Sequence, residues 1–419
     1  MTFHRQVHAL MAAPFLLKHP DVGKMFPADA IARAKALLPA FAGSIGAYTD
    51  SRGSAAVRKM VADFIAARDG IPAPDPDHIF LTDGASVAVR YVLNAAIRGP
   101  EDCILVPIPQ YPLYSASIQL YGGTLLPYNL KEDKGWAADV SEIKASIAAA
   151  RKAGKCPRAL VFINPGNPTG QCLTAAALAE LVKLAHEENI VLLADEVYQP
   201  NVYQDEKPFV SARKVMAELG APYNTEVELA SFHTVSKGVL GECGLRGGYV
   251  EVANFHPGTV DEMYKAASIN LSPNTTGQVA LSMLVDPPKA GDESFPLFQK
   301  EMDAENASLR RRAHLMTDSF NALEGVTCTF TEGAMYSFPK LALPPKAIAA
   351  AKAAGKEPDT FYCLRLLEET GIVTVPGSGF GQEAGTFHLR TTILPLEPVM
   401  EDFVQRFKTF HAKFMDEFR

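Results

Sequence analysis

The sequence predicts an α/β protein in which a mostly parallel sheet is flanked by helices and a smaller α+β domain accompanies it. Short continuous apolar runs, such as Cys103–Pro107 and Ala159–Ile163, have the composition of strands buried on both faces. Helical patterns such as Thr174–Glu188 separate these runs, which is typical of parallel strands joined by crossover helices. Because 419 residues exceed what one ordinary core holds together, we expect more than one domain.

The composition is that of a globular chain, with 47% hydrophobic and 21% charged residues. A net charge of -7 and the lack of a Lys/Arg block argue against a nucleic-acid partner. No apolar run is long enough to cross a bilayer, so we expect no membrane partner. The six cysteines show no C-x-x-C spacing and are expected to be reduced thiols. His4 and His8 share a helix face without a third ligand nearby, so no metal site is expected.

Three segments are expected along the chain. Residues 1–42 have helical patterns and are assigned to the N-terminal part of the small domain. Residues 43–297 form the large domain, which begins with a turn-rich loop and an amphipathic helix at Ser54–Arg68. Its further strands are expected at His78–Thr82, Ile190–Ala194, Val227–Phe232 and Gly248–Val252. Residues 298–419 form the small C-terminal domain, with helices at Phe298–Leu323, Thr360–Thr370 and Glu397–Phe418 and strands around Val326–Phe330, Met335–Phe338 and Phe387–Thr392.

Polar residues follow the ends of the strands, where open α/β sheets gather their ligands. After the first strand, Asp83-Gly-Ala-Ser86 opens a helix whose N–H groups at Ala85 and Ser86 offer an anion site. Helix capping by Asp83 or Ser86 is the alternative. After the second strand, Tyr111 is placed to stack on a flat ring, or to pack as an ordinary loop aromatic.

Two further strand ends carry amide and acid side chains. The turn Asn164-Pro-Gly-Asn-Pro-Thr-Gly170 is fixed by its prolines, and Asn167 can donate to a ligand oxygen or bond its own backbone. Asp195-Glu-Val-Tyr198 follows an apolar strand, where an acid is costly to bury without a partner. A pyridinium N–H would suit Asp195, and Tyr198 could then reach a neighbouring phenolic oxygen. A salt-bridged acid accounts well for Glu196 and poorly for Asp195.

A lysine and two arginines complete the set. Lys237 lies among small and apolar residues with several glycines behind it, and its amine can form a Schiff base with a carbonyl cofactor. A snorkelling lysine before a glycine-rich turn is the alternative. Arg246 offers a rigid fork to a phosphate. Arg390 lies mid-strand among apolar neighbours and needs an anionic partner, either a substrate carboxylate or a structural ion pair.

Together these residues describe one ligand. It has an anionic group, a flat ring, a ring nitrogen for an acid to pair with, a phenolic oxygen and an aldehyde for an amine. Pyridoxal 5′-phosphate has all of these features, and it is the cofactor that the sequence predicts.

The ordered set of motifs resembles the class I/II aminotransferases of fold type I, and the resemblance covers essentially the whole chain. Three stretches are similar to the alanine aminotransferase branch: Ser236-Lys-Gly-Val-Leu-Gly-Glu-Cys-Gly-Leu-Arg-Gly-Gly-Tyr249, Ile45-Gly-Ala-Tyr-Thr-Asp-Ser-Arg-Gly53 and Pro376-Gly-Ser-Gly-Phe-Gly-Gln382. That branch also has one extra residue between the lysine and the phosphate arginine. Members of that branch usually carry a longer segment before the stretch that begins at Thr2, with an arm and a glycine-containing loop near the substrate. By this resemblance, we expect that segment to be missing here.

The resemblance implies a homodimeric enzyme that moves an amino group between L-alanine and 2-oxoglutarate. Another specificity, such as glutamate:glyoxylate, stays open, as do a lyase and a non-enzymatic cofactor-binding protein. Its partners would be small amino acids and 2-oxo acids. A cytoplasmic location is expected, and a mitochondrial one is left open.

The same resemblance implies roles for single residues. Lys237 would hold the cofactor and move the Cα proton, Asp195 would pair with the ring nitrogen, and Tyr198 would contact the phenolate oxygen. Arg390, with Asn167, would bind the substrate carboxylate. The other implied cofactor contacts are Ala85, Ser86, Tyr111, Asn167, Thr234, Ser236 and Arg246, with Tyr48 reaching the phosphate from the neighbouring subunit.

Overall fold

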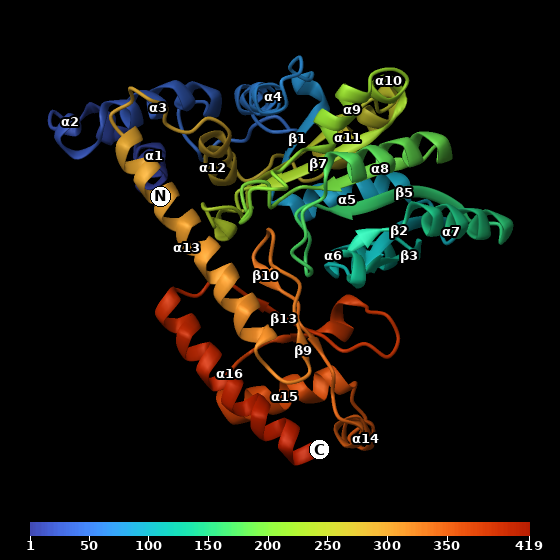
Figure 1. Ribbon diagram of the computed structural model, residues 1–419. Coiled ribbons are helices and arrows are strands. Elements are labelled where there is room, and N and C mark those ends of the chain that lie inside the picture. The colour runs from blue at the N-terminus through green and yellow to red at the C-terminus, as the bar shows by residue number, and fades with distance from the viewer.

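An eight-stranded sheet lies at the centre of the upper part of the molecule in Figure 1, which shows the computed structural model of residues 1–419. The strands follow the spatial order β1-β8-β7-β6-β5-β2-β3-β4. From β3 to β7 the neighbouring strands pair in parallel, whereas β8 is antiparallel to β1 and β7, and β4 to β3. The mostly parallel sheet predicted from the sequence is therefore confirmed. The bounds are Ile79–Thr82 for β1, Asp102–Ile108 for β2, Thr124–Lys131 for β3, Ala137–Ala138 for β4, Cys156–Ile163 for β5, Val191–Asp195 for β6, Leu229–Thr234 for β7 and Gly248–Ala253 for β8.

Helices cover both faces of this sheet. Side chains alternate along each strand, so Ile104 and Val106 of β2 pack with α5, α6 and α11, whereas Leu105 packs with α7, α8 and α9. Burial of each large aliphatic side chain contributes about 1.5–3 kcal/mol, so the two covered faces stabilise the central strands. The bounds are Ala85–Ala96 for α5, Leu113–Leu120 for α6, Val140–Lys152 for α7, Ala175–Glu188 for α8, Ala212–Leu219 for α9, Tyr223–Glu226 for α10 and Pro257–Ser268 for α11.

The N-terminal helices α1 (Thr2–Ala12), α2 (Val22–Met25) and α3 (Ala28–Leu37) pack against the large domain. They share one apolar core with α4 (Ala55–Asp69) and α12 (Thr275–Val285), beside which they lie in Figure 1. The core of the lower part includes no residue before Tyr203. This packing differs from the expected assignment of residues 1–42 to the small domain. An amphipathic stripe predicts that one helix face is buried, but it does not identify the surface that covers it.

The long helix α13 (Phe295–Asn321) connects the two parts of the molecule, beginning next to α1 and ending in the lower part (Figure 1). There it packs with α14 (Pro345–Ala353), α15 (Pro358–Thr370) and α16 (Glu397–Phe418). Two small antiparallel sheets complete this part, with orders β10-β13-β12 and β11-β9. The bounds are Val326–Thr327 for β9, Tyr336–Ser337 for β10, Lys340–Leu341 for β11, Val375–Pro376 for β12 and Leu389–Thr392 for β13.

Several elements have no counterpart among the sequence-based expectations, which omit β3 and the helices α7, α9, α11 and α12. Strand β3 is half-exposed along most of its length, and Pro127 interrupts its apolar residues, so it lacks the continuous run that marks the central strands. No helix has both the length and the apolar character that a membrane span requires.

Candidate active site

A cavity of about 290 Å³ lies at the carboxyl ends of the parallel strands. Tyr336 and Arg390 line it from the lower part of the molecule, so it lies between the two parts. Every site residue expected from the sequence lines this cavity except Tyr48, namely Ala85, Ser86, Tyr111, Asn167, Asp195, Tyr198, Thr234, Ser236, Lys237, Arg246 and Arg390. The side chain of Tyr48 is 79% exposed.

Asp195, the last residue of β6, has one carboxylate oxygen paired and one free. The hydroxyl of Tyr114 donates a hydrogen bond of 2.7 Å to Oδ2, while the buried Oδ1 has no partner. Burial raises the pKa of Asp195, and the hydrogen bond from Tyr114 opposes this rise. An unpaired carboxylate oxygen is costly to bury, so this site favours a ligand that brings a positively charged N–H.

Tyr198, Asn167 and Arg390 form one hydrogen-bonded chain across the cavity. The amide nitrogen of Asn167 donates to the Tyr198 hydroxyl at 3.3 Å, and its Oδ1 accepts from Nη1 of Arg390 at 3.1 Å. The Tyr198 hydroxyl donates in turn to that of Tyr336 at 3.2 Å. Burial raises the pKa of Tyr198, and its contact with Tyr336 adds to the rise. Both groups of the Asn167 amide bond other side chains, so the alternative of a bond to its own backbone does not hold.

The guanidinium of Arg390 lies between two aromatic rings. Its Cζ is 4.4 Å from the ring centre of Tyr336 and 4.6 Å from that of Phe380. It forms no ion pair with any carboxylate of this chain, and its buried Nε has no hydrogen-bond partner. The alternative of a structural ion pair is therefore wrong. A planar cation fixed between rings with an unused donor suits a planar anion that binds at two points.

The opposite end of the cavity is built around the start of α5. Its first residues, Ala85 and Ser86, have N–H groups without an intrahelical acceptor. The residue before them is Gly84, and neither Asp83 nor Ser86 caps the helix, so the capping alternative is wrong. Gly84 has φ of +88°, and a Cβ there would overlap the Arg246 guanidinium. The helix start and Arg246 therefore face the same space, which suits a phosphate.

Around Arg246 the remaining donors converge on this space. Its Nη2 donates to the Asp83 carbonyl at 3.0 Å and its Nη1 to the Cys243 carbonyl at 2.8 Å. The Thr234 hydroxyl donates to the Gly247 carbonyl at 2.7 Å and accepts from the N–H of Ser236 at 3.2 Å. These bonds fix the orientation of the side chains, while Arg246 itself stays exposed at the mouth of the cavity.

Lys237 is half-buried in the loop after β7, and its Nζ lies 5.4 Å from the ring centre of Tyr198. The next residue anchors this loop, because the N–H of Gly238 donates to Oδ1 of the buried Asn201 at 2.8 Å. Gly238 has φ of +72°, and a Cβ there would come within 2.7 Å of Cγ of Pro200. The alternative of a lysine reaching outward to solvent does not hold, since the amine faces the cavity.

Comparisons with known proteins bear on this geometry. The family model "Aminotransferase class I and II" matches residues 21–407. The chain belongs to this family. It is 59% identical to "Glutamate--glyoxylate aminotransferase 2" of Arabidopsis thaliana and 51% identical to "Probable alanine aminotransferase, mitochondrial" of Dictyostelium discoideum. The matches cover all of this chain and 87% and 78% of those proteins. A solved alanine aminotransferase from Pyrococcus furiosus is similar with a TM-score of 0.75 and 26% identity, over 90% of this chain and 88% of that one.

Aminotransferases of this family depend on pyridoxal 5′-phosphate, and the cavity supplies the groups that this cofactor requires. The unpaired Oδ1 of Asp195 is available for the ring nitrogen, and the start of α5 with Arg246 is available for the phosphate. The amine of Lys237 lies on the same cavity. The residues present therefore fit the cofactor.

Three residues of the aminotransferase site have no role in the sequence-based expectations. Tyr114 donates to Asp195, while Tyr336 and Phe380 hold Arg390. Tyr114 lies in the first turn of α6, whereas Tyr111 precedes that helix, so no helical spacing relates the two. No local pattern marks Tyr114 as a partner of Asp195, or Tyr336 and Phe380 as partners of Arg390.

Glu196 has different surroundings from those expected. It accepts a hydrogen bond of 2.7 Å from the N–H of Ala212 and forms no ion pair, although the guanidinium of Arg68 lies near enough to lower its pKa. Burial outweighs this effect and raises the pKa of Glu196 to about 8. The expected salt bridge is therefore absent, and Glu196 does not line the aminotransferase cavity.

Proposed function

We propose that this aminotransferase moves the amino group of L-alanine to 2-oxoglutarate, giving pyruvate and L-glutamate. The observation that carries the proposal is Arg390, a cation without an anionic partner that is held between two rings at the cavity. Both substrates are carboxylates, and each would occupy this arginine in turn. Several relatives named alanine aminotransferase, at 47–51% identity, support the choice of donor and acceptor.

Each residue of the cavity would have a defined task. Arg390 and Asn167 would bind the substrate carboxylate and orient the Cα–H bond toward Lys237. The Lys237 amine would accept the Cα proton and return it at the other end of the reacting system. The Asp195 carboxylate would keep the ring nitrogen of the cofactor protonated, and the Tyr198 hydroxyl would hydrogen-bond its phenolic oxygen. The bound cofactor would supply the electron sink for the electron pair that proton removal leaves.

A glutamate:glyoxylate specificity is the second candidate, because a relative with that name is 59% identical to this chain. Three pairs separate the two: alanine with 2-oxoglutarate, alanine with glyoxylate, and glutamate with glyoxylate, because glutamate with 2-oxoglutarate gives no net reaction. We expect the highest kcat/KM for alanine with 2-oxoglutarate. A higher value for glutamate with glyoxylate would replace the proposal with the second candidate, and no transfer with any pair would overturn both.

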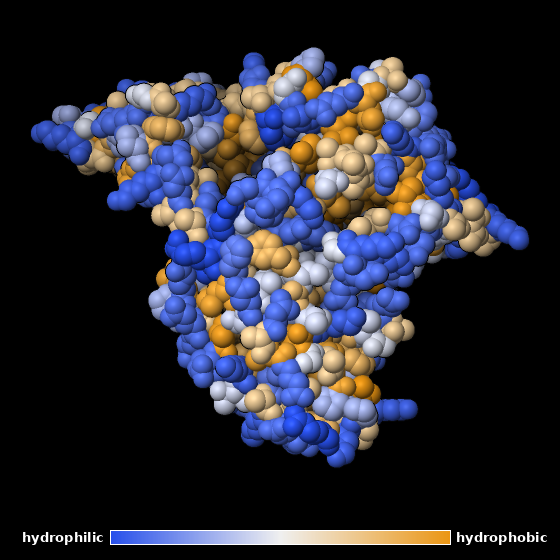
Figure 2. Space-filling model, viewed as in Figure 1, coloured by the Kyte–Doolittle hydropathy of each residue, from blue (hydrophilic) through white to orange (hydrophobic).

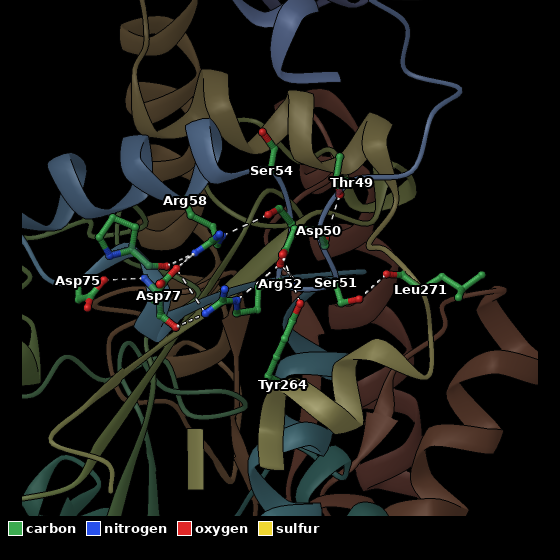
Figure 3. Close-up of polar contacts among 12 residues, drawn as sticks. Thr49, Asp50, Ser51, Arg52, Ser54, Arg58, Asp75, Asp77, Tyr264 and Leu271 are labelled. Atoms are coloured by element: carbon green, nitrogen blue, oxygen red, sulfur yellow. Dashed lines mark hydrogen bonds and ion pairs between the residues drawn. The ribbon is translucent and has the colours of Figure 1, made fainter. Parts of the chain in front are cut away.

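We further propose that the working unit is a homodimer in which Tyr48 of one protomer reaches the phosphate end of its partner's site. The loop before Ser54 is held in place by an Arg52–Asp77 ion pair of 3.3 Å and by a 2.7 Å hydrogen bond from Ser51 to the Leu271 carbonyl (Figure 3). It nevertheless leaves Tyr48 exposed, and Ile269 and Leu271 are exposed as well, at 81% and 58%. A second copy would cover these apolar side chains.

Mixing two inactive variants tests this arrangement. Tyr48→Ala and Lys237→Ala subunits, each nearly inactive alone at limiting cofactor, are unfolded together and refolded as a mixture. Random pairing puts one intact site in half of the dimers, so we expect about a quarter of wild-type activity to return. A mixture that stays inactive while light scattering shows dimers would contradict a shared site.

The location in the cell stays a proposal as well. We propose the cytoplasm, whereas the relative from Dictyostelium discoideum is named as mitochondrial. Fractionation of the source cells with a marker for each compartment decides between the two.

A further inference from the structure

A second cavity, of about 310 Å³, lies on the other side of the loop that carries Lys237. Figure 2 shows orange atoms lining a hollow beside the place of α12 in Figure 1, the helix whose Met283 and Leu284 line this cavity. Most of its lining is apolar, including Phe64, Phe209, Leu240, Phe298 and Met302. It has about twice the volume of the ~150 Å³ apolar cavity that admits benzene, so it can hold a molecule the size of two fused rings.

Two buried histidines line this cavity, and one ring nitrogen of each lacks a hydrogen-bond partner. His4 and His233 are each only 3% exposed, and Nε2 of His4 and Nδ1 of His233 have no partner. An unpaired buried polar atom costs about 1–3 kcal/mol, which a ligand hydroxyl or amide would recover. Their environment also sets the charge of the ligand, because burial lowers the pKa of both imidazoles to about 3.

Arg68, the charged side chain that lines this cavity, already has hydrogen-bond and ion-pair partners within the chain. Arg68 donates from Nε to Oδ1 of Asp69 at 2.7 Å and from Nη1 to Oε1 of Gln199 at 2.9 Å, and its Nη2 pairs with Oδ2 of Asp69. An anionic ligand would have to displace the Asp69 carboxylate. Neutral imidazoles and a satisfied guanidinium therefore favour an uncharged ligand.

Adjacent residues in the chain divide between the two cavities. Tyr198 lines the cofactor cavity and Gln199 lines the second one, while Lys237 lines the first and Gly238 the second. The hydrogen bond from Gly238 to Asn201 ties these two segments together. A molecule that packs against Gly238 and Leu240 would thus press on the loop that positions the Lys237 amine.

We propose that this cavity is a binding site for an uncharged, largely hydrocarbon molecule of two-ring size with one hydroxyl or amide group, held by His4, and that its occupation acts on Lys237. This inference goes beyond the proposed amino-group transfer and does not depend on which amino acid is the donor.

The test uses cofactor-loaded protein with 2-naphthol as the probe and naphthalene as its match without the hydroxyl. We expect saturable binding of one naphthol per chain, with naphthalene about tenfold weaker because it cannot bond the imidazole. His4→Phe should reduce that ratio to about twofold. No saturable binding overturns the site, and an unchanged ratio in His4→Phe overturns the assignment of its polar end.

Two tryptophan substitutions on α13 locate the site. Met302→Trp fills the cavity and should abolish naphthol binding, whereas Leu297→Trp, at a 48% exposed position outside the lining, should leave it unchanged. If Met302→Trp does not fold, Leu284→Phe fills the same space. Binding that survives the filled cavity overturns the proposal. So does a Met302→Trp protein that becomes monomeric while Leu297→Trp does not, because the cavity would then seat a second copy of the chain.

The link to Lys237 has its own readout. Saturating naphthol should move the pH midpoint of the visible absorbance of the bound cofactor by about one pH unit, a coupling of the usual size for two linked sites. The Met302→Trp protein should show no such movement. An unmoved midpoint in the wild-type protein, with naphthol bound, overturns the action on Lys237.

Discussion

Asp195 and Glu196 are neighbours in the chain and both carboxyls are buried, yet they have different surroundings at the end of β6. Burial raises the pKa of each. Asp195 has the Tyr114 hydroxyl on one oxygen, leaves the other unpaired and lines the cofactor cavity, whereas Glu196 lies near Arg68 and Glu251 and does not line it. With a pKa of about 8, Glu196 holds a proton at neutral pH and needs no cation. Burial therefore does not distinguish a functional acid from a structural one, but access of a free oxygen to a cavity does.

The largest loss of turnover is expected from a substitution that removes the reacting amine from the cavity. Lys237→Ala removes the only amine that lines the cavity, so turnover should fall by at least about 10⁴-fold and the visible absorbance of the bound cofactor should disappear. The exposed Lys265→Ala protein is the control, with expected wild-type values. Turnover and absorbance kept in Lys237→Ala would refute the assignment.

The two acids give the direct comparison. Asp195→Asn should lower turnover by about 10³-fold, because a neutral amide does not stabilise charge on the ring nitrogen. Glu196→Gln is nearly isosteric with the protonated acid and should change turnover by less than about threefold. Steady-state kinetics at saturating cofactor measure both. Equal losses in the two variants would mean that cavity access is not what separates the acids.

Arg390→Ala should raise KM for alanine by about 10²-fold, because a two-point contact with the carboxylate is lost. Arg390→Lys keeps the charge but not the planar fork, so it should recover only part of that affinity. Arg365→Ala, which breaks an ion-pair network remote from the cavity, is the control. A KM that stays unchanged in Arg390→Ala would remove this residue from substrate binding.

Tyr114→Phe should lower turnover about tenfold, because it removes the donor that opposes the rise of the Asp195 pKa. The acidic limb of the pH–rate profile should move to higher pH. Tyr128→Phe removes another buried hydroxyl, bonded to the Val161 carbonyl, and should not move the profile. Parallel shifts in both variants would indicate a packing effect instead.

Glu196→Gln is expected to have the smallest effect on activity but a clear effect on the pH dependence of stability. The pKa of Glu196 is raised in the folded protein, so its contribution to stability is complete below the ordinary pKa near 4.5 and is lost as the pH rises toward 8. The free energy of unfolding should therefore fall by about 3–5 kcal/mol more in wild type than in Glu196→Gln between pH 5 and 8. Urea titrations at several pH values measure this difference, and identical pH profiles would contradict it.

The site residues at the strand ends were predictable from the sequence because a local residue pattern marks each strand and its end. A continuous apolar run such as Val191–Ala194 marks a buried strand, and the polar residue that follows it must lie at the sheet edge. For this reason the residues from Ala85 to Lys237 that meet at the cavity could be placed together before the structure.

Contacts between distant segments were not predictable in the same way. Tyr114 and Asp195 are 81 residues apart, so no local pattern pairs them. Asn167 and Arg390 are 223 residues apart, and only the family resemblance placed them at the same ligand. The N-terminal helices show the same limit, since their apolar stripes fit either domain and only the packing against α4 and α12 decides. The half-exposed strand β3 was not predicted, because its residue pattern differs little from that of a loop.

The central claim is that the cofactor is attached to the amine that faces Asp195 across this cavity. Reduction of the cofactor-loaded protein with sodium borohydride, followed by peptide mapping, makes that attachment permanent and locates it. The prediction is a modified peptide that contains Lys237 and no other modified lysine. Modification of a different lysine, or of none, would contradict the account.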